Sequence, residues 1–599
     1  MEGRFFMTDF TPLISFLVRM ITLVSIMCFS FFCTLAYLYE KMYTMNTPSM
    51  SKTPDTKTLF HILIIICVAL GARFLYGQIQ RTPGVLMYPD SYGYYGLGTQ
   101  MVASPRLSTV ITPYRTPLYP LFVGGTAFLL GKAGADVRSP DFQRVGSTII
   151  LLQELIAIVT LILLYKGLSY LDLNKRRALF ITLFFSVDPM LLAFERTMLT
   201  ETMTVFFSAL VTYASVRILM KPTHMNFLLF LAASTLGFLT RPAFLAIPVA
   251  AAPFLLWFFF RKKNRLAMGF VMLTTLCYLL VPVLYSWINE RYYGYKGIQE
   301  VSDIDMLGRI LEFRISPDAG KDIRFLYTEV QKQQRFGGPT MPFEFINSFD
   351  PTLYGNMEKM NGLQTFVRRV VKTNFALYCL HAFSYSPRML FDVSTATFIP
   401  DQAPSKEKTL FQILWHVYRI SQYPSVLVFF VFPFLLSLFF KHTTIQRTVA
   451  VLCISIVVTQ VLLTVFVVYY EDYGRLALIF RPQLYILFLY GAQNVCKKGL
   501  ALLKKNVNAR GYLETKTKRV ILASSELVEG RVQNQILDKT IETDQSLLFW
   551  SSVSLCIPDP QIRVIRVSGK MSPNIRNGFR IQKPHVILRQ DEKADGCMG

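Results

Sequence analysis

Long apolar runs recur along this chain, and they constrain its fold more than any other feature. A helix needs about 20 apolar residues to cross the hydrocarbon core of a bilayer. The runs that we read as spans are Thr11–Leu38, Leu59–Gly77, Val145–Leu164, Ala178–Phe194, Thr202–Met220, Phe227–Leu239, Ala243–Phe260, Ala267–Trp287, Val426–Phe440, Val449–Tyr469 and Leu476–Val495. The sequence therefore predicts an all-α polytopic membrane protein with about 11 transmembrane helices.

The composition agrees with this fold class. Of the 599 residues, 52% are hydrophobic and only 17% are charged, a balance too apolar for a soluble globular protein. The formal charge of +24 would suggest nucleic-acid binding in a soluble chain. In a membrane protein, lysine and arginine concentrate in cytoplasmic loops and contact lipid headgroups, so we expect membrane lipids as partners and no nucleic acid.

The distribution of apolar and polar residues divides the chain into five parts. Short semi-apolar pieces in the first long loop, such as Leu118–Leu130, predict helices that lie along the membrane interface. The predicted parts are an accessory N-terminal transmembrane helix (1–49), a membrane core with the first outer loop (50–287), a mixed outer loop domain (288–422), the C-terminal helices of the core (423–496) and a basic, partly disordered tail (497–599).

Basic residues recur in every second loop, and the positive-inside rule assigns these loops to the cytoplasm. They are the loops holding Lys175–Arg177, Lys221, Arg261–Arg265, Lys441–Arg447 and Lys497–Lys498. The remaining loops then face the other side, and they hold Asp90, Arg115, Glu201, Arg241 and Glu471–Arg475. The unusual charges near helix ends are thus predicted to gather on the extracytoplasmic face.

Two carboxylates in these outer loops are candidates for chemistry. Asp90 lies just beyond a predicted span, where a carboxylate can act as a general base toward an acceptor hydroxyl. The alternative for Asp90 is a hydrated turn residue after Pro89. Glu201 is a candidate for contact with the acceptor or a metal ion, and the alternative is an acidic residue that stabilises a helix start.

Arginines near the membrane boundary form a second group of candidates. Arg241 lies in a short turn between two apolar runs, Arg475 lies in the last outer turn, and Arg481 lies within the final run. Guanidinium groups in such places bind a phosphate or a distant carboxylate, so these three and Arg115 are candidates for holding a lipid-linked phosphate. For Arg241, snorkelling to a lipid phosphate is the alternative.

Motifs for several other chemistries are missing from the sequence. The nine cysteines include no CxxC pair, no two of the six histidines have metal-ligand spacing, and neither a nucleophile elbow nor a glycine-rich phosphate loop occurs. We therefore predict neither ATP use nor serine-triad hydrolysis. No cofactor is predicted, and the sequence does not decide whether a divalent metal ion takes part.

Five short motifs, in order, carry a family resemblance. They are residues 89–95 (Pro-Asp-Ser-Tyr-Gly-Tyr-Tyr), 115–120 (Arg-Thr-Pro-Leu-Tyr-Pro), 199–201 (Leu-Thr-Glu), 239–242 (Leu-Thr-Arg-Pro) and 473–475 (Tyr-Gly-Arg), the last followed by Arg481 and Pro482. With this pattern the chain resembles the C-type glycosyltransferase superfamily, in the branch of the protein O-mannosyltransferases and the aminoarabinose lipid A transferase. The resemblance covers roughly residues 59–495.

The resemblance implies a glycosyltransferase that moves a sugar, with inversion, from a polyprenyl-phosphate donor to a lipid, glycan or protein acceptor. Asp90 would be the catalytic base. Many relatives have Asp-Glu in this loop whereas this chain has Asp90 and Ser91, so a second carboxylate is either absent or supplied by Glu201. Tyr94 and Tyr95 are candidates for stacking on sugar faces, and anchoring at the membrane interface explains them equally well.

Two other functions stay open from the sequence. A lipid-linked glycan polymerase or ligase would use similar residues, and a transporter or flippase would need polar or broken helices near the bilayer midplane and often an internal repeat. The expected location is a cell membrane, taken as the bacterial cytoplasmic membrane, with the site outside and the tail in the cytoplasm.

Overall fold

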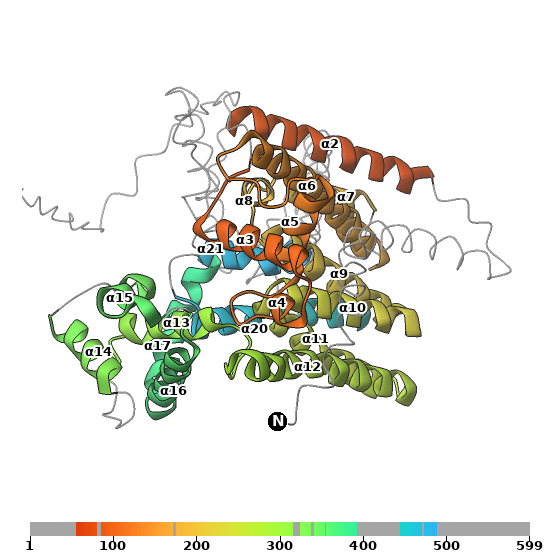
Figure 1. The fold of residues 1–599 in the computed structure, drawn as a ribbon. Coiled ribbons are helices and arrows are strands. Elements are labelled where there is room, and N and C mark those ends of the chain that lie inside the picture. The colour runs from red at the N-terminus through yellow and green to blue at the C-terminus, as the bar shows by residue number, and fades with distance from the viewer. Residues whose placement is uncertain are drawn as a thin grey trace, which may run out of the picture. The chain divides into compact units, whose positions relative to one another are not determined.

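The computed structural model describes residues 56–80, 85–171, 175–315, 324–336, 341–353, 355–391, 444–469 and 473–487 (Figure 1). Its helices are α2 (Thr56–Gln80), α3 (Pro89–Ala103), α4 (Leu107–Val110), α5 (Leu118–Leu129), α6 (Pro140–Tyr170), α7 (Lys175–Ser186), α8 (Pro189–Glu195), α9 (Glu201–Met220), α10 (His224–Thr240), η1 (Pro242–Leu245), α11 (Ala246–Arg261), α12 (Arg265–Tyr293), α13 (Glu300–Glu312), α14 (Arg324–Phe336), α15 (Pro342–Phe349), η3 (Pro351–Leu353), α16 (Met357–Thr373), α17 (Phe375–Phe391), α20 (Thr444–Val467), α21 (Tyr473–Leu476) and η6 (Ala477–Phe480). The described part is therefore mostly helical, as predicted.

Most of the predicted spans that fall in the described residues are long apolar helices. Six helical segments are long and apolar enough to cross a membrane, or seven if the bent pair α7 and α8 counts as one span. They correspond to α2, α6, α9, η1 with α11, α12 and α20. Two expected spans, Phe227–Leu239 and the start of Leu476–Val495, are shorter apolar helices here. The expected helices Thr11–Leu38 and Val426–Phe440, and the tail 497–599, lie outside the described residues.

Local sequence explains where these helices begin and bend. Ser139 caps α6 by accepting a hydrogen bond from the Phe142 backbone N–H, and Pro140 occupies the first helical position. The expected span Ala178–Phe194 bends by 55° between α7 and α8. Asp188 and Pro189 produce the bend, because Pro189 has no N–H to continue α7 and the Asp188 carboxylate caps α8 at Met190.

Helix α9 forms the centre of the membrane part. Most of its residues are buried, and it packs against α6, α10, α11, α20 and η6. A helix that is apolar all round is expected inside a bundle rather than on its surface. Glu201 is the first residue of α9, so its buried carboxylate lies at one end of this enclosed helix.

The first outer loop folds as three helices that cover one end of this bundle. Helices α3 and α5 pack closely, and residues 118–127 of α5 are buried. We expected Leu118–Leu130 to lie along the membrane interface; in the structure residues 118–127 pack within the protein, whereas Phe128, Leu129 and Leu130 are exposed. The burial of residues 118–127 follows from the almost unbroken apolar sequence, which leaves no polar side to face water.

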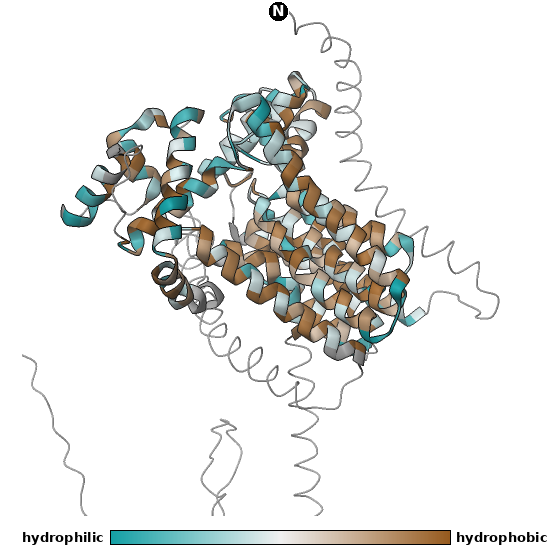
Figure 2. Cartoon of the chain, turned by 90° about the horizontal axis from the view of Figure 1, so that it is seen from below, coloured by the Kyte–Doolittle hydropathy of each residue, from teal (hydrophilic) through white to brown (hydrophobic). Residues whose placement is uncertain are grey.

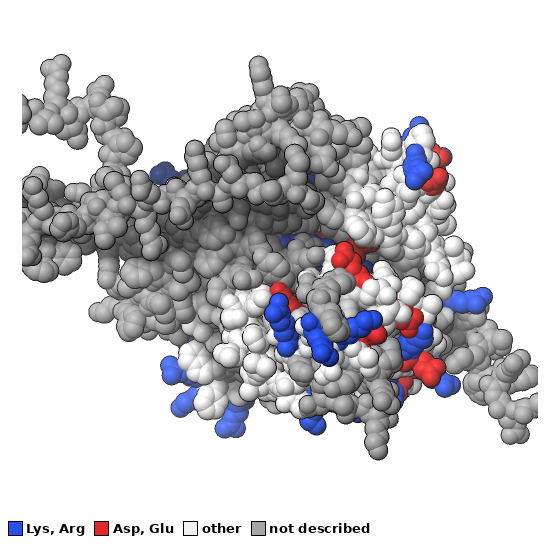
Figure 3. All heavy atoms as spheres, turned by 90° about the vertical axis from the view of Figure 1, so that its left-hand side faces the viewer, with Lys and Arg blue, Asp and Glu red and all other residues white. Residues whose placement is uncertain are grey.

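The segment after α12 folds as a group of amphipathic helices, α13 to α17. Figure 2 shows that apolar residues dominate the bundle, whereas polar and apolar residues alternate around the helices of this group. On the face of Figure 3, which looks onto the left-hand side of Figure 1, lysine and arginine side chains are interspersed with aspartate and glutamate side chains. This mixed surface is typical of helices that contact water on one side.

Candidate active site

Asp90 is positioned by a short extended segment that leads into α3. The backbone N–H of Leu86 donates to the Arg196 carbonyl at 2.9 Å, and the N–H of Met198 donates to the Leu86 carbonyl at 3.2 Å. This isolated parallel bridge joins Leu86 to Thr197. Pro89 then begins α3, and Asp90 lies in its first turn. Because Thr197 precedes Glu201 by four residues, the bridge also fixes the Asp90 segment to the start of α9.

A close crossing of α3 and α5 fixes the other end of α3. A Cβ atom added to Gly98 would lie 2.1 Å from the Pro120 carbonyl oxygen and 2.9 Å from the Gly124 nitrogen. The two helices therefore meet backbone to backbone, which only glycine permits. Since Arg115 lies three residues before α5, this crossing also fixes Arg115 relative to Asp90.

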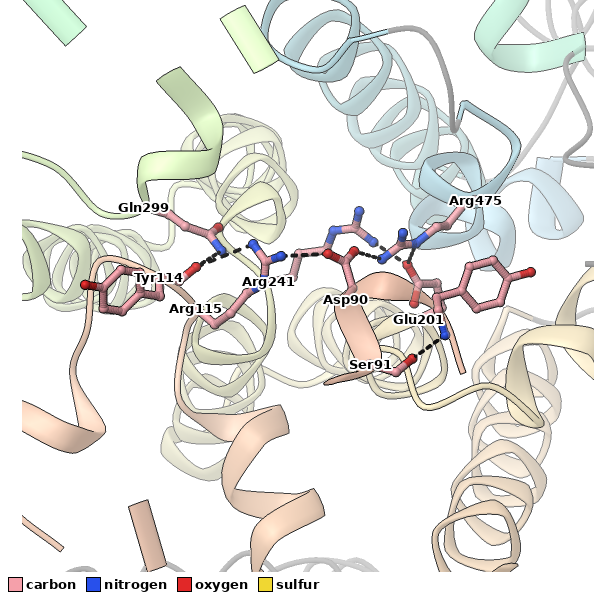
Figure 4. Close-up of polar contacts among 9 residues, drawn as sticks. Asp90, Ser91, Tyr114, Arg115, Glu201, Arg241, Gln299 and Arg475 are labelled. Atoms are coloured by element: carbon pink, nitrogen blue, oxygen red, sulfur yellow. Dashed lines mark hydrogen bonds and ion pairs between the residues drawn. The ribbon is translucent and has the colours of Figure 1, made fainter. Parts of the chain in front are cut away.

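Asp90 contacts two of the predicted arginines (Figure 4). Arg115 donates from Nη2 to Asp90 Oδ1 at 2.6 Å, and Arg475 donates from Nη2 to Asp90 Oδ2 at 3.2 Å. Burial alone would raise the pKa of Asp90, but the guanidinium groups of Arg115 and Arg475 outweigh burial and hold the pKa below its ordinary value. Asp90 is therefore an ionised and partly exposed carboxylate in this state.

Glu201 forms the second half of the same cluster. Arg241 donates from Nη1 to Glu201 Oε1 at 2.8 Å, and Arg475 donates from Nε to that same oxygen. The Glu201 side chain is fully buried, and its Oε2 atom has no hydrogen-bond partner. Arg475 thus bridges the two carboxylates, and residues from five separate segments meet at one place (Figure 4).

Three guanidinium groups meet at this cluster. Those of Arg115, Arg241 and Arg475 form ion pairs with the carboxylates of Asp90 and Glu201. Three arginines close together, with the accessible position of Asp90, suit an anionic ligand that displaces a carboxylate from an arginine. In the part of the chain that the structure describes, no group of three or more His, Cys, Asp or Glu side chains is arranged to hold a metal ion.

Arg481 lies in a different ion pair. Its Nη1 atom donates to Asp188 Oδ2 at 2.6 Å, and the Tyr485 hydroxyl donates to the same oxygen at 2.9 Å. Arg481 and Asp188 are both buried. The Asp188 carboxylate neutralises Arg481 inside the bundle, so Arg481 stands apart from the three arginines that contact Asp90 and Glu201.

Tyr94 and Tyr95 follow Asp90 on α3, and both are buried. The Tyr94 ring packs edge-on against Tyr119 and lies beneath the guanidinium of Arg115, 5.6 Å from ring centroid to Cζ. The Tyr95 ring packs edge-on against Phe142, and its hydroxyl donates to the Ala135 carbonyl at 3.0 Å. Tyr94 therefore supports Arg115 from below, whereas Tyr95 fastens α3 to the loop before α6.

The sequence reasoning missed several buried ionic residues. Arg73, within the first described span, donates to Glu195 Oε1 at 2.6 Å, and both side chains are buried. An arginine in the middle of an apolar run is a recognisable signal, because a charge there needs a partner. Glu195 and Glu201 also line one small pocket together with Arg73 and Thr202. Asp305 on α13 was also missed, and it lies in electrostatic contact with Asp90, Arg115 and Arg241.

One known protein family matches part of this chain. Residues 142–287 match the model of the family described as dolichyl-phosphate-mannose-protein mannosyltransferase. The matched segment runs from α6 to α12 and includes Glu201 and Arg241. The resemblance to the C-type glycosyltransferase superfamily that the short motifs predicted is confirmed over this segment. With six candidate spans in the described residues, the chain is a multi-pass membrane protein.

Two solved structures resemble this chain at low sequence identity. One is the crystal structure of ArnT from Cupriavidus metallidurans in the apo state, which is 12% identical to this chain. The alignment covers 71% of this chain and 77% of that chain, and its TM-score is 0.30. The same protein bound to undecaprenyl phosphate shares 14% identity, covering 70% and 77% with a TM-score of 0.29. No curated protein matches the chain significantly.

Proposed function

We propose that this protein is an integral-membrane glycosyltransferase that moves a sugar from a polyprenyl-phosphate donor to an acceptor hydroxyl, with inversion, on the extracytoplasmic face. The observation that carries the proposal is the cluster in which Arg475 bridges Asp90 and Glu201 with Arg115 and Arg241 beside them. Further support comes from the match at residues 142–287, since the name of that family describes a mannosyl group carried on a polyprenyl phosphate.

The arginines would hold the donor phosphate. The two non-bridging oxygens of a phosphodiester can replace a carboxylate at a guanidinium group, because both N–H donors of the fork again find acceptors. Asp90 is the replaceable partner, since its side chain is 34% exposed whereas that of Glu201 is fully buried. Glu201 would stay in place and hold Arg241 and Arg475 toward the phosphate.

This exchange would also prepare the base. While Arg115 and Arg475 bind the Asp90 carboxylate, its pKa is low and it is a weak base. When a phosphate takes over these arginines, Asp90 loses its stabilising partners and its pKa rises. Donor binding would therefore strengthen the base only when there is a sugar to transfer.

The bonds and charges of the step then balance. Asp90 takes the proton of the acceptor hydroxyl, the acceptor oxygen bonds to the anomeric carbon, and the bond between that carbon and the phosphate oxygen breaks. The leaving polyprenyl phosphate gains one negative charge, which Arg115, Arg241 and Arg475 stabilise. No nucleotide is needed, because the phosphate-linked sugar is already activated.

The extracytoplasmic placement of the site is supported by loop charges. The loops between α6 and α7, α9 and α10, and α11 and α12 carry Lys175, Lys221 and Arg261. The loops at the opposite ends of these helices carry Glu201 and Arg241. Because lysine and arginine are retained in the cytoplasm, the cluster would face outward.

The test is transfer of labelled sugar from a panel of polyprenyl-phosphate sugars by membranes that contain matched amounts of protein. We expect transfer by the wild type, loss of transfer by Asp90→Asn, and retention of polyprenyl-phosphate binding by that variant. Asp141→Asn is the matched control, because Asp141 also lies in the first turn of a helix and pairs with a lysine, Lys132, at 3.0 Å, outside the cluster.

Other outcomes would redirect the proposal. Full activity of Asp90→Asn would remove Asp90 from the mechanism. Absence of transfer by the wild type with every donor, despite binding of polyprenyl phosphate, would favour a flippase. Transfer of whole glycan chains rather than single sugars would favour a polymerase or ligase. A parallel reaction with EDTA measures whether a divalent metal ion contributes.

A further inference from the structure

Helix α13 is held over the cluster by contacts at its first residues. The backbone N–H of Glu300 donates to the Pro113 carbonyl at 2.9 Å, and Gln299 Nε2 donates to the Tyr114 carbonyl at 2.9 Å. These two acceptors immediately precede Arg115, which binds Asp90. Figure 4 shows Gln299 reaching Tyr114 beside Arg115. The start of α13 is therefore fastened to the segment that carries a site arginine.

A second contact fixes the middle of α13. A Cβ atom added to Gly308 would lie 2.9 Å from Tyr469 and 2.9 Å from Pro342, so α13 packs tightly at this point. Tyr469 lies six residues before Arg475. Helix α13 thus joins the segment of Arg115 to the segment of Arg475, and Asp305 lies between the two points of attachment.

The surroundings of Asp305 differ from those of Asp303 and Glu312 on the same helix. Asp303 accepts hydrogen bonds from the Tyr295 hydroxyl and Gln364, so it is fully engaged in holding α13 to its neighbours. Glu312 pairs with Arg309 at 2.6 Å. Asp305 forms no hydrogen bond or ion pair with any described residue, and it is partly exposed.

Asp305 nevertheless belongs to the charge cluster. The charged groups that face it are Arg115 and Asp90 from the first outer loop, Arg241 from the turn after α10, and Arg309 from its own helix. Burial dominates over these arginines and raises the pKa of Asp305 to about 7. Two carboxylates with opposite pKa shifts, Asp90 and Asp305, therefore lie at one site, and such pairs perform different tasks.

We propose that Asp305 binds the acceptor, by accepting a hydrogen bond from a hydroxyl or amine that neighbours the attacking hydroxyl, and so holds that hydroxyl against Asp90. The inference rests on the proposed function. The acceptor would then carry at least two hydrogen-bond donors close together, as a sugar or another polyol does.

Titration gives a readout that a merely structural role would not move. An ionised carboxylate accepts hydrogen bonds more strongly than a protonated one. Since Asp305 becomes ionised as the pH rises through about 7, the acceptor should bind more tightly above that pH than below it. The donor binds at the arginines and should show no such dependence.

The experiment measures label transfer from a polyprenyl-phosphate sugar into a serially diluted membrane extract that supplies the acceptor. For the wild type, the extract concentration that gives half-maximal rate should fall several-fold between about pH 6 and about pH 8. Asp305→Asn should need about tenfold more extract or more, without this pH dependence, and its half-saturating donor concentration should change less than about twofold. Asp305→Glu should recover part of the loss.

Asp303→Asn is the matched control on the same helix. It should lower the thermal stability of the protein modestly, because a neutral amide oxygen accepts the bonds from Tyr295 and Gln364 more weakly than a carboxylate does, and it should leave the extract requirement unchanged. A flat pH profile in the wild type, or an unchanged extract requirement in Asp305→Asn, would overturn the inference. If the wild type transfers sugar and Asp90→Asn does not, such a result leaves the proposed function intact. If the wild type transfers nothing, the proposed function itself fails.

Discussion

The Asp90 carboxylate lies 2.6 Å from the guanidinium of Arg115, and the two side chains are 34% and 20% exposed. An ion pair in contact with water contributes little to stability, because solvent screens it and both side chains lose freedom. Opening this pair therefore costs the protein little. The ion pair instead fixes positions: it keeps the proposed base, Asp90, next to the proposed phosphate-binding group, Arg115, until a ligand separates them.

Replacing Arg115 should shift the pH dependence of transfer. In the wild type, Asp90 loses its charge, and transfer falls, as the pH drops through a pKa that Arg115 holds low. Arg115→Gln removes one of the two guanidinium groups that lower the pKa of Asp90, so this pKa rises and activity should be lost at a higher pH. The measurement is the rate at a donor concentration far below half-saturation, which reports the protein before the donor binds, over a series of acidic buffers.

Arg106→Gln serves as the control for this experiment, because Arg106 is exposed and lies outside the cluster. It should keep the wild-type profile. An acidic limb at the same pH in Arg115→Gln and wild type would mean that protonation of Asp90 does not limit the rate.

Removing Glu201 should destabilise the fold as well as the site. Its buried carboxylate pairs with Arg241 and Arg475, and removal of one partner of a buried pair typically costs about 3–5 kcal/mol. We expect Glu201→Ala to lower the unfolding temperature in detergent, and Glu201→Gln to lower it less because the amide oxygen still accepts a hydrogen bond. Glu290→Gln, at an exposed pair with Lys296, should change it little. Equal unfolding temperatures for Glu201→Ala and wild type would contradict the buried pairing.

The crossing of α3 and α5 can be tested with two glycines on one helix. Gly98→Ala would place a methyl group against the Pro120 carbonyl, so we expect a loss of about 1–3 kcal/mol and reduced transfer as α3 moves Asp90. Nothing lies within 4 Å of a Cβ atom at Gly96, so Gly96→Ala should be neutral or slightly stabilising. Unfolding temperature and transfer rate are measured for both. Similar behaviour of the two variants would argue against a close crossing.

Arg241 and Arg481 should behave differently although both are arginines near helix ends. Arg481→Met leaves Asp188 buried without its partner, so the expected effect is lower stability with an unchanged half-saturating donor concentration. Arg241→Met should raise the half-saturating donor concentration, because Arg241 belongs to the proposed phosphate site. If Arg481→Met kept normal stability but had a higher half-saturating donor concentration, Arg481 would have to be part of the donor site.

Much of the fold follows from local sequence, and the site only partly does. Run length alone predicts α2, α6, α9 and α12, because hydrocarbon thickness sets the length of an apolar span. Loop charges also predicted that Asp90, Glu201 and Arg475 lie on one side of the membrane, and the structure brings these three into contact. The positive-inside rule assigns each loop to one of only two sides, so this single rule groups residues that lie far apart in the sequence.

Partners within the bundle could not be predicted in this way. Arg481 pairs with Asp188, 293 residues earlier, and no local pattern links the two. The place of Asp305 near Asp90 could not be predicted for a similar reason. Its helix is amphipathic, so an acidic residue there indicates only a water-facing side, and its closeness to Asp90 depends on how α13 docks on residues 113–115.

The cluster is complete only in a chain that reaches the last described segment, because that segment supplies Arg475. Arg475 lies 274 residues after Glu201 and 385 residues after Asp90. A chain that stops before this segment would keep the apolar spans up to α20, but its Glu201 would pair with Arg241 alone and its Asp90 with Arg115 alone.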